Sequence, residues 1–210
     1  MSADRAPSLR LACALGTLLA LAACNNPDAS RDSLAPTSPK LSGARLPSAV
    51  AESIRDPLQL CQIDLQQPTG VGTGGSAPTT SLNVRGTLEV CETDTYQPAT
   101  NSLLVHAVGT GTASHLGRFM MVDDGIAYLS TSSGGGSATF FAANGDSFTA
   151  TETGLAAITD GIAEITDYAT VTGGTGRFAG ATGGLTIVRR RDLSSPLSSG
   201  WFYGTIDLAK

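Results

Sequence analysis

Few side chains in this sequence have the type and spacing that metal or acid–base chemistry requires. The two histidines, His106 and His115, lie nine positions apart, and two imidazoles can share a metal ion. A zinc site normally needs three or four protein ligands, so Asp123 or Asp124 would have to join them. No HExxH motif accompanies the pair. We therefore expect no metal and no cofactor, with His106 on a strand face and His115 bonded to loop backbone near Gly117.

Two short charged runs could also carry a site. Asp123-Asp124-Gly125 lies between two apolar segments and lacks the alternating oxygen ligands of a calcium loop, so it predicts a hairpin turn. Arg189-Arg190-Arg191 is predicted to project into solvent at a strand end, with phosphate binding as the alternative. There is no Gly-x-Ser-x-Gly nucleophile motif. The sequence thus identifies no catalytic residue.

Length, composition and charge limit the class of protein. The 210 residues suit one domain of ordinary size, and 25 Gly with 10 Pro imply many turns and a β-rich fold. The formal net charge of −5 does not provide the positive field that nucleic-acid binding requires. Nucleic acid is therefore excluded as a partner.

The N-terminus predicts export and a lipid anchor. Arg5 and Arg10 are followed by the uncharged run 11–23, which is shorter than the roughly 20 residues that a spanning helix needs, so residues 1–23 read as a signal peptide. The ending Leu21-Ala22-Ala23-Cys24 resembles the lipobox of bacterial lipoproteins, which implies that Cys24 is lipidated and holds the protein on membrane lipid. This places it in the bacterial cell envelope, on the periplasmic or cell-surface side. The alternative is an ordinary signal peptide with a coincidental cysteine.

Cleavage and lipidation would leave two cysteines, Cys61 and Cys91. An even remainder in an oxidising compartment predicts a disulfide, and two reduced thiols are the alternative. A bridge would close a loop of about 30 residues and stabilise the fold by roughly 3–4 kcal/mol. No CxxC spacing supports a redox or zinc role.

The mature chain divides by composition. Residues 24–47, rich in Ser, Pro, Ala and Asn, predict a flexible tether. Residues 48–80 predict a short helix and a loop, because Val50, Ile54 and Leu58 have near-helical spacing and Pro57 interrupts it. Residues 81–210 predict the folded domain.

The segment from Ser81 onward reads as eight or nine strands with turns between them. Leu82–Cys91 alternates apolar and polar residues with period two, and Asn144-Gly145 is typical of a tight hairpin. The further expected strands are 103–112, 116–122, 126–130, 138–143, 147–153, 162–172, 184–190 and 201–208. Connections this short favour antiparallel pairing, and a closed barrel, rather than two stacked sheets, is the fold we expect.

A glycine-rich turn carries a resemblance to known families. The run Thr172–Gly184 resembles the turn motif of the dirigent and allene oxide cyclase families, which share an eight-stranded antiparallel β-barrel. The matching residues are Gly173, Gly174, Thr175, Gly176, Phe178, Ala181 and Gly183. His115–Gly117 and Ala142–Asp146 are also similar to a group of uncharacterised bacterial secreted proteins. The resemblance spans about 82–208 and implies a barrel whose end Phe178 plugs, and no catalytic residue of either plant family maps onto this sequence.

Three hypotheses for function follow. Inward positions rich in Ala, Gly and Thr predict an under-filled interior that binds a small apolar ligand. The alternatives are a solid barrel with a structural or interaction role, and an isomerase or cyclase of the allene oxide cyclase type. The runs 119–122 and 139–142 are apolar at both parities, so they predict an apolar outer patch that residues 48–60 or a second subunit of a homo-oligomer must cover.

Overall fold

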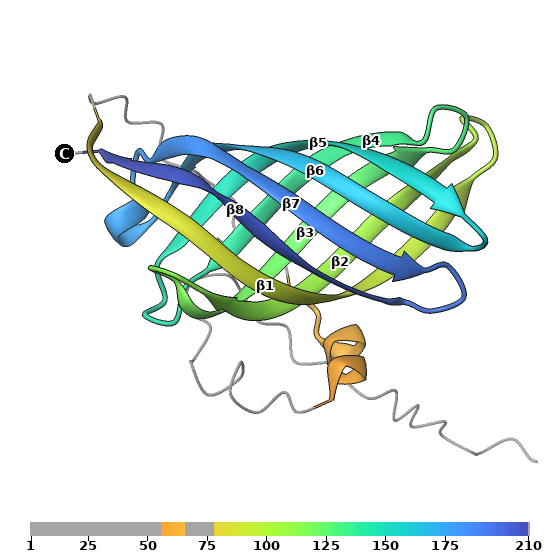
Figure 1. The fold of residues 1–210 in the computed structure, drawn as a ribbon, viewed down its shortest axis with the longest axis horizontal. Coiled ribbons are helices and arrows are strands. Elements are labelled where there is room, and N and C mark those ends of the chain that lie inside the picture. The colour runs from red at the N-terminus through yellow and green to blue at the C-terminus, as the bar shows by residue number, and fades with distance from the viewer. Residues whose placement is uncertain (1–55, 66–77, 210) are drawn as a thin grey trace, which may run out of the picture. The chain divides into compact units, whose positions relative to one another are not determined.

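The chain folds into a closed barrel of eight antiparallel strands, as the sequence predicted (Figure 1). The computed structural model describes residues 56–65 and 78–209. Each strand pairs with the next, and β8 returns to pair with β1. The strands are β1 (Pro78–Gln97), β2 (Ser102–Ala113), β3 (Gly117–Tyr128), β4 (Ser133–Phe141), β5 (Ser147–Thr159), β6 (Ile162–Gly174), β7 (Thr182–Asp192) and β8 (Leu197–Ala209). No helix among these residues is long and apolar enough to cross a membrane.

The expected hairpin at Asn144-Gly145 is confirmed, and the one at Asp123-Asp124-Gly125 is wrong. Gly145 has φ +87° between β4 and β5, and the Asn144 side chain donates to Asp146 Oδ2 at 2.7 Å. The second run instead lies inside β3, where its residues pair with 136–138 of β4. The two strands expected at 116–122 and 126–130 are therefore one continuous strand, with charged residues in its middle.

Phenylalanines fill one half of the barrel. Phe140 stacks on Phe148 with ring centroids 4.7 Å apart, and Phe119 and Phe202 each lie within 5.8 Å of the Phe140 centroid. Phe178 lies in the 3-10 helix η2 (Gly176–Phe178), is fully buried and contacts Phe148 edge-on at 5.5 Å. The expectation of an under-filled interior is wrong for this half, because five of the six phenylalanines of the sequence lie in this inner cluster.

The glycine-rich motif closes the Phe178 end of the barrel. Gly173 and Gly174 end β6, Thr175 Oγ1 accepts a hydrogen bond from the Ser147 backbone N–H at 3.0 Å, and Ala181 is buried in the inner cluster.

Two glycines of this motif are required by the backbone. Gly176 has φ +55°, and Gly183 has φ +134° with the position of an added Cβ only 2.1 Å from the Thr205 carbonyl oxygen. A side chain at Gly183 would therefore be strained and would also meet the backbone of β8.

A short segment covers an apolar patch on the outside of the barrel. The 3-10 helix η1 (Pro57–Gln62) begins at Pro57. The helix expected before this proline falls on residues 48–55, which lie outside the described residues. Leu60 and Leu65 are buried against the outward side chains of β2, β3 and β4, which are Val108, Met120, Val122 and Phe141. The outer patch thus has its cover within this chain.

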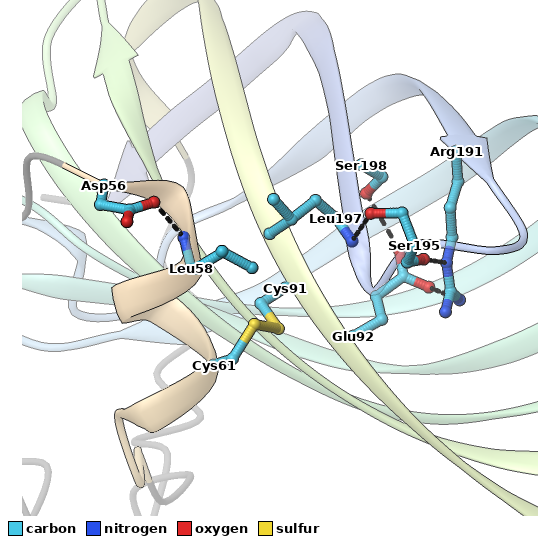
Figure 2. Close-up of a disulfide and its surroundings, with 9 residues drawn as sticks. All are labelled: Asp56, Leu58, Cys61, Cys91, Glu92, Arg191, Ser195, Leu197 and Ser198. Carbon is cyan, nitrogen blue, oxygen red and sulfur yellow. Dashed lines mark hydrogen bonds and ion pairs between the residues drawn. A yellow bond between two sulfur atoms is a disulfide. The ribbon is translucent and has the colours of Figure 1, made fainter.

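A disulfide between Cys61 and Cys91 joins η1 to β1, with the two Cα atoms 5.3 Å apart (Figure 2). Cys91 points toward η1, whereas its neighbour Glu92 points toward Arg191. Successive β1 side chains lie on opposite faces of the wall, so one segment of strand carries the covalent link outside and a charged group inside.

Candidate functional site

The inward positions of the barrel change from apolar to charged along the strands. β1 places Val84, Leu88 and Val90 in the inner apolar cluster and continues the same alternation with Glu92 and Asp94. The other charged or hydroxyl groups of this half are Asp123, Glu152, Asp167, Arg189, Arg191 and Ser198. Antiparallel pairing gathers them at the barrel end opposite Phe178, because the odd-numbered strands run toward that end and the even-numbered strands leave it.

Arg189 is the centre of this charged group. Its Nη1 donates to Glu92 Oε1 and, at 3.2 Å, to Ser198 Oγ, and its Nη2 donates to Asp167 Oδ2 at 3.2 Å. Burial by itself lowers the pKa of Arg189, but the charges of Glu92, Asp167 and Asp123 raise it above its ordinary value. The guanidinium therefore stays charged inside the barrel.

Arg191 holds the second half of the network. Its Nη1 donates to Glu92 Oε2 at 2.8 Å, and its Nε donates to the Ser195 carbonyl oxygen at 3.1 Å (Figure 2). The same Nη1 also donates to Asp94 Oδ2 at 2.8 Å. Glu92 thus bridges the two arginines, one through each carboxylate oxygen. Asp94 Oδ1 is buried and has no hydrogen-bond partner among the described residues.

Two further acids face the arginines without bonding them. Burial, reinforced by the charges of Asp167 and Glu92 against the opposing pull of Arg189, raises the pKa of Asp123 to about 7. Burial, followed by the charge of Asp123, raises the pKa of Glu152 well above its ordinary value, and Glu152 Oε1 has no hydrogen-bond partner in the described chain. Burial and the neighbouring negative charge therefore favour the protonated form of Glu152, and the carboxyl of Asp123 titrates near pH 7.

Asp167 belongs to both groups of acids. Burial raises its pKa, and the charge and hydrogen bond of Arg189 partly offset this rise. Five carboxyl groups consequently surround two guanidinium groups, and the hydrogen bonds of those guanidinium groups are directed to Glu92, Asp94 and Asp167. The polar atoms of this charged cluster that are left to bind a ligand are therefore carboxyl oxygens.

These residues form the floor of a cavity of about 260 Å³. Its apolar wall includes Leu103, Val105, Ile165 and Leu193. Glycines occupy several inward positions of the neighbouring strands, namely Gly125, Gly136 and Gly154, so no side chains fill this space. A Cβ at Gly154 would lie 2.1 Å from Asp167 Oδ1, so this glycine also makes room for the acid.

The histidines predicted to be structural lie away from this cavity. His106 is on the outer face of β2, where its Nδ1 lies 2.7 Å from Asp124 Oδ1 across the strand pair. His115 is in the β2–β3 turn with φ +64°, and its carbonyl oxygen accepts a hydrogen bond from Arg177. Asp123 and Asp124 point to opposite faces of β3. The described part of the chain holds no cluster of three or more metal-ligating side chains.

The prediction for the arginine run is wrong in two of its three positions. Arg190 is exposed on the outer face of β7, but Arg189 and Arg191 lie inside the barrel. The run lies at the C-terminal end of β7, as expected, but it is still part of the pleated strand, so its alternate members must face inward. Partner carboxylates on β1 and β6 compensate their burial.

A periodicity signal for the pocket was present in the sequence. Glu92 and Asp94 share the parity of Leu88 and Val90, and Arg189 and Arg191 share the parity of Ile187. Extending each apolar alternation by two residues would have placed these charges inside. The pairing across the barrel could not be read in this way, because it depends on which strands close the sheet.

The fold and this pocket define the class of the protein: a closed eight-stranded antiparallel barrel with a charged cavity at one end. No family model and no curated protein matches the chain. Among solved structures, the chain is similar to a pterocarpan synthase dirigent protein, with 12% sequence identity and a TM-score of 0.49. This match covers 69% of the present chain and 98% of the other. The assignment to a bacterial lipoprotein branch of such barrels stays a prediction, and Cys24 lies outside the described residues.

Proposed function

We propose that this protein is a membrane-anchored bacterial lipoprotein whose barrel binds a small ligand in the cavity at the Arg189 end. The observation that carries the proposal is a cavity of about 260 Å³ whose floor holds two buried carboxyl oxygens without hydrogen-bond partners, on Asp94 and Glu152, beside Asp123, whose pKa burial raises to about 7. A cavity with an apolar wall and a few convergent polar groups is the usual form of a small-molecule site.

The chemistry of the floor specifies one end of the ligand. Five carboxyl groups outnumber two guanidinium groups, and both arginines already bind carboxylates. An anionic ligand would meet this acidic excess, whereas an ammonium group would bond Asp123 and the free oxygens of Glu152 and Asp94. The other end of the ligand is apolar, since it lies against Leu103 and Ile165. The apolar ligand expected from the sequence is thereby refined to an apolar molecule with a basic or hydrogen-bond-donating end.

Three molecules with the same alkyl tail test this reading. We expect isothermal titration calorimetry to give tighter binding of octylamine than of octanol, and no binding of octanoate. Octylamine should bind more tightly as the pH rises from 6 to 8, because Asp123 becomes charged over this range. Asp123→Asn and Glu152→Gln should weaken the binding of octylamine, and Glu164→Gln, on the exposed face of β6, should not. Equal affinities for the three molecules, or no effect of the two inner variants, would contradict the proposal.

An isomerase is the second candidate, and the pKa of Asp123 supports it. A carboxyl group with a pKa of about 7 inside a cavity can take up and release a proton at neutral pH. The two functions differ in the fate of the ligand. A molecule extracted from the native protein and returned to it should be recovered unchanged from a carrier and as an isomer from an enzyme. A barrel with a purely structural role should yield no bound molecule at all.

The anchor and the oligomeric state have separate tests. Mass analysis of the native protein should find acyl chains on Cys24, and Cys24→Ser should release the protein from the membrane fraction. A protein that stays membrane-bound after this substitution would contradict lipid anchoring. A homo-oligomer was expected because a second subunit could cover the outer patch of Met120 and Phe141. Because η1 already covers this patch, association would have to use another part of the surface. Light scattering tests this, and a monomer would contradict the proposal of a homo-oligomer.

A further inference from the structure

The outer face of β8 carries an exposed aromatic pair. Trp201 and Tyr203 are 50% and 49% exposed, and their rings stack with centroids 5.5 Å apart and planes 21° from parallel. Both side chains point away from the barrel, because the intervening Phe202 points into its core. A soluble fold gains little from holding two large aromatic rings together in water, so such a pair marks a binding surface.

The aromatic pair lies in a depression of the barrel wall. One groove extends from Trp201 toward Arg190 and a second extends toward Asn83, and the two grooves share Thr87, Thr112 and Arg118. β8 runs between β1 and β7 here (Figure 1). The groove continues on both sides of Trp201, so it has room for a chain of repeating units.

Glycines on the inner side of the same strands account for this depression. Gly86 of β1, Gly111 of β2 and Gly200 of β8 alternate with the outward residues of the groove. A Cβ at Gly111 would lie 2.0 Å from the Thr87 carbonyl oxygen, and one at Gly200 would lie 2.0 Å from the Val188 carbonyl oxygen. The strands therefore approach too closely for side chains on the inner side, and the wall can bend inward.

Most neighbours of the aromatic pair carry hydroxyl or guanidinium groups. Across the strands, Trp201 is paired with Thr87 and Val188, and Tyr203 is paired with Thr186 and Arg85. The other hydroxyl groups that line the two grooves belong to Thr110, Thr112, Ser114, Thr166, Ser199 and Thr205. On the outer side of the wall the grooves are lined by three arginines and two glutamates, namely Arg85, Arg118, Arg190, Glu89 and Glu164, while Arg189 faces the barrel interior. This outer surface is therefore locally basic on a chain with a formal net charge of −5.

We propose that this groove binds a polysaccharide that carries carboxylate groups. The apolar C–H face of a sugar ring stacks on an exposed indole or phenol ring, which is rigid and loses little entropy on contact. Threonine and serine hydroxyls match the hydroxyl groups of successive sugars, and Arg85 matches a carboxylate through paired N–H donors. The site lies on the outside of the wall and does not depend on the ligand of the inner cavity.

The chain contains a single tryptophan, so fluorescence reports this site alone. The full chain, purified in a mild detergent, is titrated with polygalacturonate, and Trp201 emission should shift and saturate. Dextran, a neutral polysaccharide, should bind more weakly. In affinity gels that contain polygalacturonate, Trp201→Ala and Tyr203→Ala should each weaken retardation by about tenfold. Arg85→Gln should weaken retardation by polygalacturonate but not by dextran.

Tyr96→Ala is the matched control, because it removes an equally exposed aromatic ring from β1 outside the groove and should leave retardation unchanged. Far-UV circular dichroism establishes that each variant keeps the barrel. Retardation that survives Trp201→Ala but disappears in salt would overturn the proposal in favour of simple ion exchange. A shift of Trp201 emission with anionic lipid vesicles, or with protein concentration alone, and none with polygalacturonate would overturn it in favour of a membrane surface or a second copy.

Discussion

Replacing the carboxyl of Asp123 with an amide should change how the stability of the barrel depends on pH. The pKa of Asp123 is about 7 in the folded chain and 3.8 when it is unperturbed. Between these values the folded state holds a proton that the unfolded state has lost. The free energy of unfolding therefore falls as the pH rises from about 4 to above 7. Asp123→Asn removes this dependence while keeping the shape of the side chain.

The magnitude follows from the shift. A change of about three pKa units corresponds to roughly 4 kcal/mol over the whole range, and about 2–3 kcal/mol of it falls between pH 5 and pH 8. Between pH 5 and pH 8 the free energy of unfolding of the wild type should thus fall by about 2–3 kcal/mol more than that of Asp123→Asn. The charge of Asp123 also raises the pKa of Glu152, so part of the measured difference reports the coupling between these two acids.

The assay is urea unfolding at a series of pH values, followed by far-UV circular dichroism and by Trp201 emission. Glu164→Gln controls for the loss of one negative charge, because this glutamate is exposed on the outer face of β6. If wild type and Asp123→Asn give parallel curves from pH 5 to pH 8, Asp123 is not held protonated by its surroundings. The acidic account of the cavity would then have to be abandoned.

Three further perturbations test the parts of the fold that support the cavity. Reduction of the disulfide between Cys61 and Cys91, 30 residues apart, should lower the free energy of unfolding by roughly 3–4 kcal/mol, and an unchanged urea midpoint with dithiothreitol would refute this. Phe140→Ala should cost about 3–5 kcal/mol because this ring packs against three others, and Phe141→Ala should instead loosen η1, seen as faster proteolysis before residue 78. Gly183→Ala should destabilise the barrel in thermal melts by more than the roughly 1 kcal/mol of an ordinary surface change, and an unchanged melting temperature would show that the β7–β8 contact relaxes freely.

The strands and their antiparallel pairing with sequence neighbours could be predicted because their signals are local. Alternation in Leu82–Cys91 and the Asn144-Gly145 turn both depend on residues close in sequence, and the short connections leave only antiparallel pairing. Phe178 was likewise predicted from a local motif to plug one end, and it does so.

The interior of the pocket could not be predicted, because its charges are compensated only across the barrel. Arg189 is 97 residues from Glu92 in the sequence, and their pairing requires β7 and β1 to lie on either side of β8. Without that partner, an arginine run is assigned to solvent, since an unpaired buried charge is prohibitively unfavourable. Asp123 was assigned to a turn for the same reason. Charged residues within a strand sequence are interpreted as a turn unless the oppositely charged partners across the barrel are known.

The charged half of the barrel is best explained by function rather than by stability. Exchanging a buried ion-pair network for well-packed apolar residues is often neutral or stabilising, and the Phe140 half of the same barrel is packed in that way. The charged half also leaves Glu152 Oε1 and Asp94 Oδ1 without partners beside an open cavity, and each unmet oxygen costs free energy. In a barrel with a purely structural role, we would expect apolar side chains to fill this half as phenylalanines fill the other. Oxygens kept unbonded at a buried floor are what a ligand with donor groups would complete.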